Sequence, residues 1–106
     1  MTKKVSVGAA DLKEGELRGV EVDKRMILLA RDAGRVHALD NWCNHAGCLL
    51  SGGRVERNLV ICPCHEVGFE LATGRVATSP RLCDDQQRFA AEERDGQIWV
   101  ELPDDP

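Results

Sequence analysis

Two short pairs of cysteine and histidine most constrain what this chain can fold into. Cys43 and His45 form a Cys-x-His pair, and Cys62 and His65 form a Cys-x-x-His pair. Only 16 residues lie between His45 and Cys62. With five cysteines and three histidines in 106 residues, each pair should arise by chance only about 0.14 times. Two thiolates and two imidazoles can enclose one metal centre, so the fold is expected to bring both loops together.

The way the four side chains are distributed separates two kinds of metal centre. Tetrahedral zinc accepts two cysteines and two histidines, but zinc fingers usually take the cysteines from one pair and the histidines from another. Here each loop supplies one of each. This suits a two-iron cluster in which one iron takes both thiolates and the other takes both imidazoles, as in a Rieske [2Fe–2S] centre. A structural zinc module is the alternative. A thiol–disulfide pair at Cys62 and Cys64 is a third hypothesis, which leaves both histidines unexplained.

The sequence around both pairs resembles that of Rieske proteins. The first loop reads CNHAGC and the second reads CPCHEVGFELATG, and the resemblance extends over about residues 5–102. It implies a Rieske-type ferredoxin with one [2Fe–2S] cluster. Carried over to this chain, Cys43 and Cys62 would ligate the inner iron. His45 and His65 would ligate the outer iron, near the surface.

Other positions are matched by the same resemblance. Pro80, in the sequence TSP, corresponds to a proline loop that shields the cluster. Cys48 and Cys64 match cysteines that are bridged in the Rieske subunits of cytochrome bc complexes, although most simple Rieske ferredoxins lack them. A Cys48–Cys64 disulfide is therefore expected. Two buried thiols are the alternative, which a reducing cytosol would favour. Cys83 has no expected partner.

Three residues of the second loop depart from the bc-type pattern. Those subunits commonly have Ser and Tyr where this chain has Val67 and Phe69. The missing hydroxyls would donate hydrogen bonds to sulfur, which stabilise the reduced cluster and raise its potential. We therefore expect a lower potential here, and Phe69→Tyr should raise it. Glu66 replaces the usual glycine, and its carboxylate either lowers the potential further or is simply solvated.

Composition limits the class of protein. A chain of 106 residues with a net charge of −4 is expected to form one domain, residues 1–106. No basic cluster is longer than Lys3–Lys4, which argues against nucleic-acid binding. The longest apolar run, Met26–Ala30, is too short to span a membrane. The N-terminal residues lack the apolar core of a signal peptide, so the expected location is the cytoplasm.

The hydrophobic pattern predicts an all-β fold, an antiparallel sandwich or barrel, because no helical period persists over three turns. Turn signals lie at Asp32–Gly34 and Arg94–Gly96. The continuous apolar run in Arg25–Arg31 suggests a strand buried on both faces, and His37 is interpreted as an ordinary strand residue. The expected strands are Lys4–Gly8, Glu16–Asp23, Arg25–Arg31, Arg35–Leu39, Arg54–Ile61, Gly68–Leu71, Gln87–Glu93 and Gln97–Leu102.

The resemblance also implies an organisation and a function. The cluster-binding subdomain would span about residues 41–82, on a base formed by about 1–40 and 83–106. The expected function is one-electron transfer from a reductase to an oxygenase or another terminal oxidoreductase. No small-molecule substrate site is evident, and the chain lacks the catalytic domain of ring-hydroxylating oxygenases, so it is expected not to be an enzyme. A small electron-transfer subunit of a larger oxidoreductase complex is the alternative.

Overall fold

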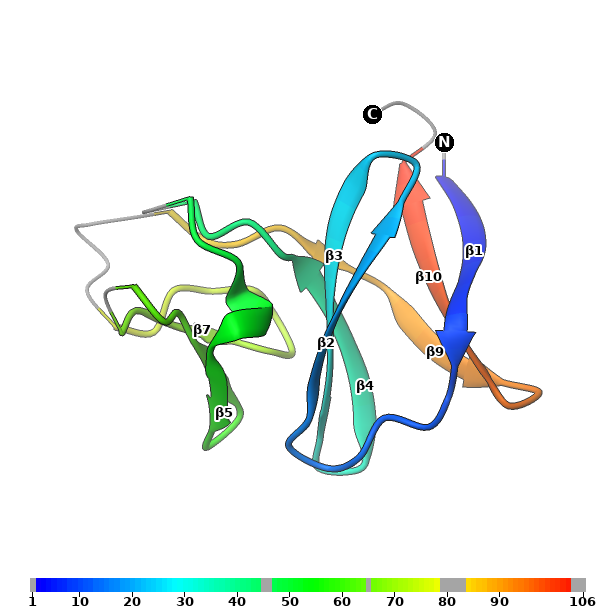
Figure 1. Cartoon of the computed structure of the whole chain (residues 1–106), viewed down its shortest axis with the longest axis horizontal. Helices are drawn as coiled ribbons and strands as arrows, with labels where there is room; N and C mark the ends of the chain where they lie inside the picture. Colours follow the sequence, from blue (N-terminus) through cyan, green and yellow to red (C-terminus); the bar gives the residue numbers. More distant parts are fainter. Residues whose placement is uncertain (1, 45–46, 65, 79–83, 104–106) are drawn as a thin grey trace.

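Short strands joined by tight turns account for most of the chain (Figure 1). The computed structural model describes residues 2–44, 47–64, 66–78 and 84–103. Within these ranges the elements are β1 (Thr2–Ala9), β2 (Leu17–Val22), β3 (Arg25–Asp32), β4 (Arg35–Asp40), the 3-10 turn η1 (Leu50–Gly52), β5 (Arg54–Glu56), β6 (Leu59–Ile61), β7 (Gly68–Glu70), β8 (Arg88–Phe89), β9 (Ala91–Arg94) and β10 (Gln97–Pro103). The predicted all-β fold is confirmed. In the described ranges no helix has the length and apolar character that a membrane span requires.

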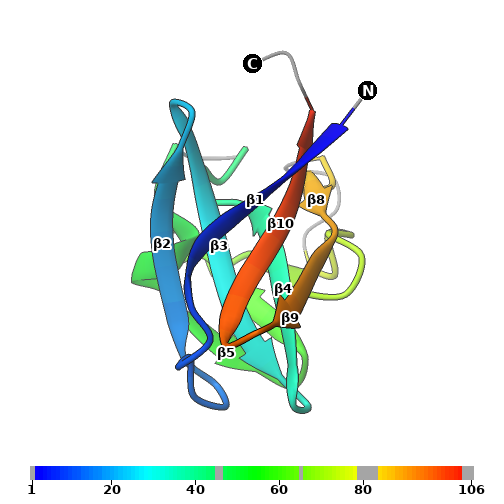
Figure 2. The same cartoon turned by 90° about the vertical axis from the view of Figure 1, so that its right-hand side faces the viewer.

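The strands form three antiparallel sheets. The first has the order β1-β10-β9, the second β2-β3-β4-β8 and the third β5-β6-β7. The first sheet lies in front of the second in Figure 2, and pairing of β1 with β10 places Thr2 opposite Pro103. The third sheet lies to one side of these two in Figure 1. The first two sheets together form the base of the molecule.

Two-residue turns close the hairpins. A turn of this kind matches the right-handed twist of the strands when both central residues have positive φ. The predicted turns at 32–34 and 94–96 are confirmed, with positive φ at Ala33 and Gly34 and at Asp95 and Gly96. Two further turns have positive φ at both central residues, Asp23–Lys24 and Arg57–Asn58, although neither turn contains a glycine.

The prediction of one strand over Arg54–Ile61 is wrong. The segment is a hairpin in which Arg54 pairs with Ile61. Arg57 and Asn58 form its turn, with φ of 49° and 64°. Asparagine adopts the left-handed region more readily than most residues. The hairpin is therefore compatible with the sequence, although Arg57 gives no turn signal.

The prediction of one strand over Gln87–Glu93 is also wrong. The segment holds two strands that belong to different sheets, since β8 pairs with β4 and β9 pairs with β10. The chain crosses between the sheets at Ala90, whose carbonyl accepts the Glu101 N–H at 2.9 Å. A strand that changes sheets keeps its alternating pattern, which explains why the sequence reads as continuous.

β3 contributes to two apolar cores. Ile27 and Leu29 belong to the core between the first two sheets, whereas Leu28 and Ala30 belong to a core that includes residues of the third sheet. All four are 0% exposed. Because successive side chains of a strand point to opposite faces, β3 is buried on both faces, as predicted. His37 lies on the adjacent β4, and its burial lowers its pKa.

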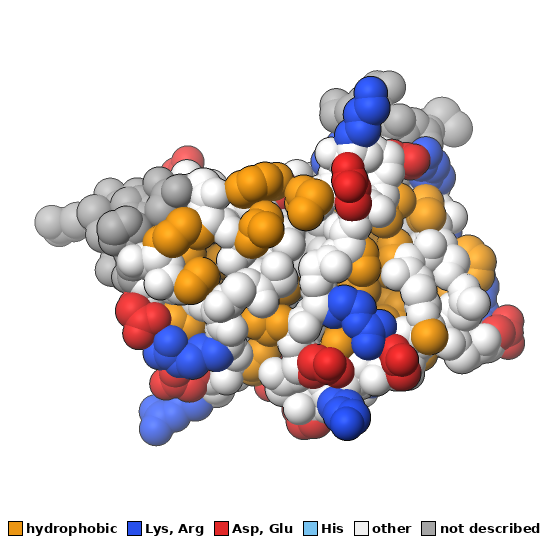
Figure 3. Space-filling model, in the orientation of Figure 1, with side chains coloured by type: hydrophobic (Ala, Val, Ile, Leu, Met, Phe, Trp, Pro, Cys, Tyr) orange, Lys and Arg blue, Asp and Glu red, His pale blue; other side chains and the backbone are white. Residues whose placement is uncertain are grey.

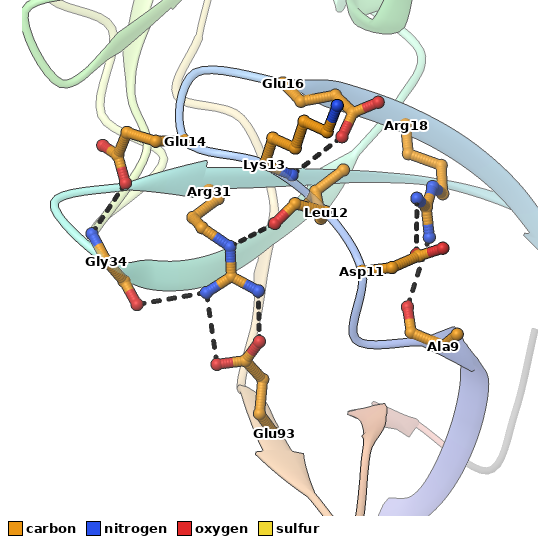
Figure 4. A network of polar contacts seen from close by, with 10 residues as sticks. All are labelled: Ala9, Asp11, Leu12, Lys13, Glu14, Glu16, Arg18, Arg31, Gly34 and Glu93. Carbon is orange, nitrogen blue, oxygen red and sulfur yellow. Dashed lines mark hydrogen bonds and ion pairs between the residues drawn. The ribbon is translucent and has the colours of Figure 1, made fainter.

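Arg31 of β3 is the centre of a network of hydrogen bonds and an ion pair in the base (Figure 4). Its Nε donates to the Leu12 carbonyl, and its Nη1 donates to the Gly34 carbonyl at 3.1 Å. Its guanidinium also pairs with the carboxylate of Glu93 on β9. Only 14% of the Arg31 side chain is exposed. The contact with Arg31 lowers the pKa of Glu93 below its ordinary value of 4.5.

Glu93→Gln is expected to lower the free energy of unfolding at neutral pH. A carboxyl group whose pKa is lower in the folded state contributes stability above its unfolded pKa, and this contribution is lost as the pH falls through the folded pKa. The difference between wild type and Glu93→Gln should therefore shrink in acid below about pH 4.5. Urea unfolding from pH 7 downwards measures it. Glu92→Gln, at an exposed pair with Lys4, should have a smaller effect, and a pH-independent difference would contradict the role of Arg31.

Candidate metal centre

The first loop (residues 43–48) follows β4 and is closed by two backbone hydrogen bonds. The Cys43 N–H donates to the Cys48 carbonyl at 2.7 Å, and the Gly47 N–H donates to the Cys43 carbonyl at 3.0 Å. Gly47 has φ of 69°, a conformation that glycine adopts without steric cost. The chain therefore turns sharply, and Cys43 is left 2% exposed. His45, the predicted ligand of this loop, lies outside the described residues.

The second loop (residues 62–67) joins β6 to β7 and repeats this backbone arrangement. The Cys62 N–H donates to the Val67 carbonyl at 2.8 Å, and the Glu66 N–H donates to the Cys62 carbonyl at 3.0 Å. Glu66 has φ of 58° and occupies the place that a glycine fills in the first loop. Cys62 is 0% exposed. His65 lies outside the described residues.

The Glu66 carboxylate makes an ion pair. Arg54 of β5 donates to both of its oxygens, at 2.9 and 3.1 Å, and its Nε donates to Glu56 at 2.8 Å. Contact with Arg54 lowers the pKa of Glu66. The carboxylate is 62% exposed, so water screens the pair. The charge beside the second loop is therefore compensated by a cation as well as by solvent. The carboxylate is not simply solvated, and its effect on the potential stays a prediction.

A disulfide connects the two loops. Cys48, at the end of the first loop, is bonded to Cys64 in the second, with their Cα atoms 6.4 Å apart. This places the two cysteine-bearing turns side by side, which any centre shared between them requires. Pro80 and Cys83, which the sequence analysis also singled out, lie outside the described residues.

Of the cysteines that the structure describes, the two outside the disulfide are buried together. Cys43 and Cys62 belong to one apolar cluster, which also contains Val67 and Phe69. Val67 is 1% exposed and Phe69 is 0% exposed. Thiolate sulfur at a dry site is a donor for iron–sulfur clusters and for zinc. The described part of the donor set therefore fits a sulfur-ligated centre at the point where the two loops meet.

Asn41 fixes the start of the first loop. This side chain is 0% exposed, and its Oδ1 accepts the Ser51 N–H at 2.8 Å while its Nδ2 donates to Ser51 Oγ at 3.0 Å. Its backbone N–H donates to the Met26 carbonyl at 2.8 Å, and its carbonyl accepts the Leu50 N–H at 2.8 Å. Gly19 passes so close that an added Cβ would lie 2.9 Å from the Asn41 amide nitrogen. The loop is thus anchored to β3 and η1.

Sequence reasoning missed three polar residues that hold the loops, namely Asn41, Arg54 and Gln86. None stands in a ligand pattern, and their partners lie elsewhere in the chain. Asn41 lies two residues before Cys43, and this proximity to the first loop is the one local signal that could have identified it. Gln86 is 5% exposed, but nothing in the sequence distinguishes it from its neighbour Gln87.

Comparison with known proteins identifies the pattern of the two loops. The family model described as Rieske [2Fe-2S] domain matches residues 3–90. Sulredoxin of Sulfurisphaera tokodaii is 30% identical over 107 aligned residues, which cover 96% of this chain and 98% of that protein. The ferredoxin component of the naphthalene 1,2-dioxygenase system of Pseudomonas putida is 32% identical over 75 residues, 71% of this chain and 72% of the component.

A solved structure of a ferredoxin bound to an enzyme is also similar. It is a complex of reduced oxygenase and oxidised ferredoxin in carbazole 1,9a-dioxygenase. The matched chain superimposes with a TM-score of 0.83 and 28% identity, covering 92% of this chain and 91% of that one. The similarity therefore extends over nearly the whole length of both chains.

Proposed function

This chain belongs to the Rieske [2Fe–2S] domain family, and from this we propose that it passes single electrons from a reductase to a terminal oxygenase. It is an electron carrier with one Rieske-type [2Fe–2S] cluster, like the ferredoxin components that it resembles. When bound, the cluster accepts and releases one electron. The observation that carries the proposal is the pair of buried cysteines on two matching loops, within the region that the family model covers.

We propose Cys43 and Cys62 as the ligands of the inner iron. Their burial in one apolar cluster supports this role, because a dry environment protects thiolate ligands from water and from exchange. We propose His45 and His65 as the ligands of the outer iron, on the basis of their spacing from the two cysteines. Pro80 is proposed to shield the cluster.

The proposed organisation follows the sheets. A cluster-binding subdomain of about residues 41–82 would contain the third sheet, and about residues 1–40 and 83–106 would form the base. Support comes from the position of the third sheet, which lies within the first of these ranges. We also propose a cytoplasmic location, where nicotinamide cofactors can supply the reductase with electrons.

A partner is proposed to dock beside the first loop. Trp42, directly before Cys43, is 50% exposed and is a large apolar side chain. In Figure 3, hydrophobic side chains gather in the upper middle of the face, and many charged side chains lie along its lower edge and on its right-hand side. Exposed apolar surface of this kind is typical of protein contact sites. We propose that the protein docking at this surface is the oxygenase. The complex of oxygenase and ferredoxin in the carbazole dioxygenase system supports this choice.

Two measurements test the proposed function. Protein purified without oxygen should contain about two irons and two acid-labile sulfides per chain, with a visible colour that bleaches on reduction. The reduced protein should then be reoxidised on rapid mixing with an oxidised Rieske oxygenase, and an NADH-dependent ferredoxin reductase should reduce it again. A colourless protein without sulfide would overturn the assignment of the cluster. A loaded protein that exchanges no electrons with either enzyme class would overturn the assignment of the partners.

Phe69→Tyr is expected to raise the reduction potential. Phe69 belongs to the same buried apolar core as Cys43 and Cys62, so a hydroxyl on its ring would be available to donate to sulfur. One hydrogen bond contributes about 1 kcal/mol, which corresponds to about 40 mV for a one-electron couple. A redox titration monitored by absorbance measures the shift. Phe89→Tyr, in the core of the base, is the matched control and should leave the potential unchanged. A potential for Phe69→Tyr that is unchanged or lower would contradict the argument.

A further inference from the structure

Gln86 is a buried polar side chain whose hydrogen-bonding capacity is fully used. It is 5% exposed. Its Nε2 donates to the Asp40 carbonyl at 2.7 Å and to the Trp42 carbonyl. Its Oε1 accepts Nδ2 of Asn44 at 2.7 Å and the Asn44 backbone N–H at 3.4 Å. A carboxamide has two donor hydrogens and two acceptor lone pairs. Three of them bond backbone groups of Asp40, Trp42 and Asn44, and the fourth bonds the Asn44 side chain.

Asn44 receives a second set of contacts from the same segment. This residue lies between Cys43 and His45 in the sequence. Its Nδ2 donates to the Asp84 carbonyl at 2.8 Å, and its Oδ1 accepts the Asp84 N–H at 3.1 Å. Residues 84–86, here called the strap, therefore hold the first loop through side chain and backbone together.

The other edge of the strap is fixed to the chain that follows β7. The Gln86 N–H donates to the Gly74 carbonyl at 2.7 Å, and the Val76 N–H donates to the Asp85 carboxylate at 2.9 Å. Gly74 has φ of +81°, and an added Cβ would lie 2.2 Å from the Gln86 carbonyl oxygen. The yellow-to-orange ribbon that contains the strap runs beside the residues that follow β4 in Figure 1.

We propose that Gln86 is a positioning residue of the metal centre. With Asn44, it fastens the backbone on both sides of Cys43 to the strap, and so joins the first loop to the chain that leaves the second. This inference rests on the proposed ligand role of Cys43. Without the Gln86 amide, the carbonyls of Asp40 and Trp42 lose a buried donor, which favours an open loop. An open loop releases iron more readily.

Gln86→Met tests the proposal, because methionine has a similar length and offers no N–H donor. The cluster-loaded variant should lose iron to a chromogenic chelator about tenfold faster than wild type at a temperature where both stay folded. The electron paramagnetic resonance lines of the reduced protein should also shift or broaden, which a general loss of stability would not cause. Gln87→Met changes an exposed side chain at the next position and should behave as wild type in both measurements.

A double-mutant comparison identifies the contact responsible. Asn44→Ala should accelerate iron release, and adding Gln86→Met should accelerate it less than the two separate effects predict, because both changes remove one shared hydrogen bond. Additive effects of the two changes on iron release would overturn the inference. So would a Gln86→Met protein with the iron release and spectrum of wild type.

If Gln86→Met does not fold, Asn44→Ala tests the inference alone, because Asn44 is an exposed position. Unchanged iron release in that variant would overturn the inference. A wild-type chain that takes up no cluster would instead refute the proposed function.

Discussion

Replacing Cys62 by serine is expected to abolish the iron–sulfur cluster and leave a colourless protein. Serine oxygen is a poor substitute for thiolate sulfur as a ligand in these centres. Cys62 is 0% exposed and lies in the same apolar cluster as Cys43, so it is not in contact with the solvent that could supply a replacement ligand. Iron and sulfide assays, with a visible spectrum of the anaerobically purified variant, measure the loss. Cys43→Ser should have the same effect.

Cys83→Ser is the matched control for this experiment. Cys83 is the fifth cysteine of the chain and stands in neither Cys/His pair, so its replacement should leave the iron content and colour of wild type. Circular dichroism of each variant distinguishes an unloaded folded protein from an unfolded one. A fully coloured Cys62→Ser protein would show that another residue ligates the inner iron, and the proposed ligand set would then be wrong.

Gly53→Ala is expected to destabilise the fold by about 3 kcal/mol or more. Gly53 lies between η1 and β5, and an added Cβ would lie 1.8 Å from the carbonyl oxygen of Ile61. That contact is with backbone, so no side chain can move aside. Arg54 and Ile61 pair across the hairpin, and Ile61 directly precedes Cys62. The hairpin would therefore have to separate at the residue that leads into the second loop, and the cluster should be lost with it.

Gly52→Ala provides the comparison for this prediction. The added Cβ of that variant would lie 3.7 Å from Cγ of Pro63, an ordinary van der Waals distance. We expect it to accumulate as wild type and to retain its colour, whereas Gly53→Ala should be recovered in low yield or unfold at much lower urea concentration. Equal stability of the two variants would mean that η1 and β5 are further from β6 than the structure places them.

The strands were predictable where the sequence carries its own turn chemistry. Ala33–Gly34 and Asp95–Gly96 contain glycine, and each closes the expected hairpin. Arg57–Asn58 adopts the same backbone without glycine. Its only local signals are Asn58 and the polar run Glu56–Asn58, which were too weak to identify that hairpin. The crossing at Ala90 was hidden because a strand that changes sheets keeps a period of two residues.

The family was predictable because both Cys/His pairs are short-range patterns. The spacing within each pair is enough to identify the four candidate metal ligands from the sequence. The residues that hold the two loops have no such local pattern, since Gln86 is 42 positions from Asn44 and Arg54 is 12 positions from Glu66. Asparagine, glutamine and arginine are common surface residues, and only the folded chain shows which of them face the loops.

The double burial of β3 gives the molecule one cooperative melting unit. Ile27 and Leu29 support the core of the base, while Leu28 and Ala30 support the core that contains both buried cysteines. A single strand cannot lose its order on one face and keep it on the other, so heat or denaturant should disrupt both regions in one transition. A group bound by the loops would then stabilise the whole fold, including β10. Its removal should lower the melting temperature of the entire chain.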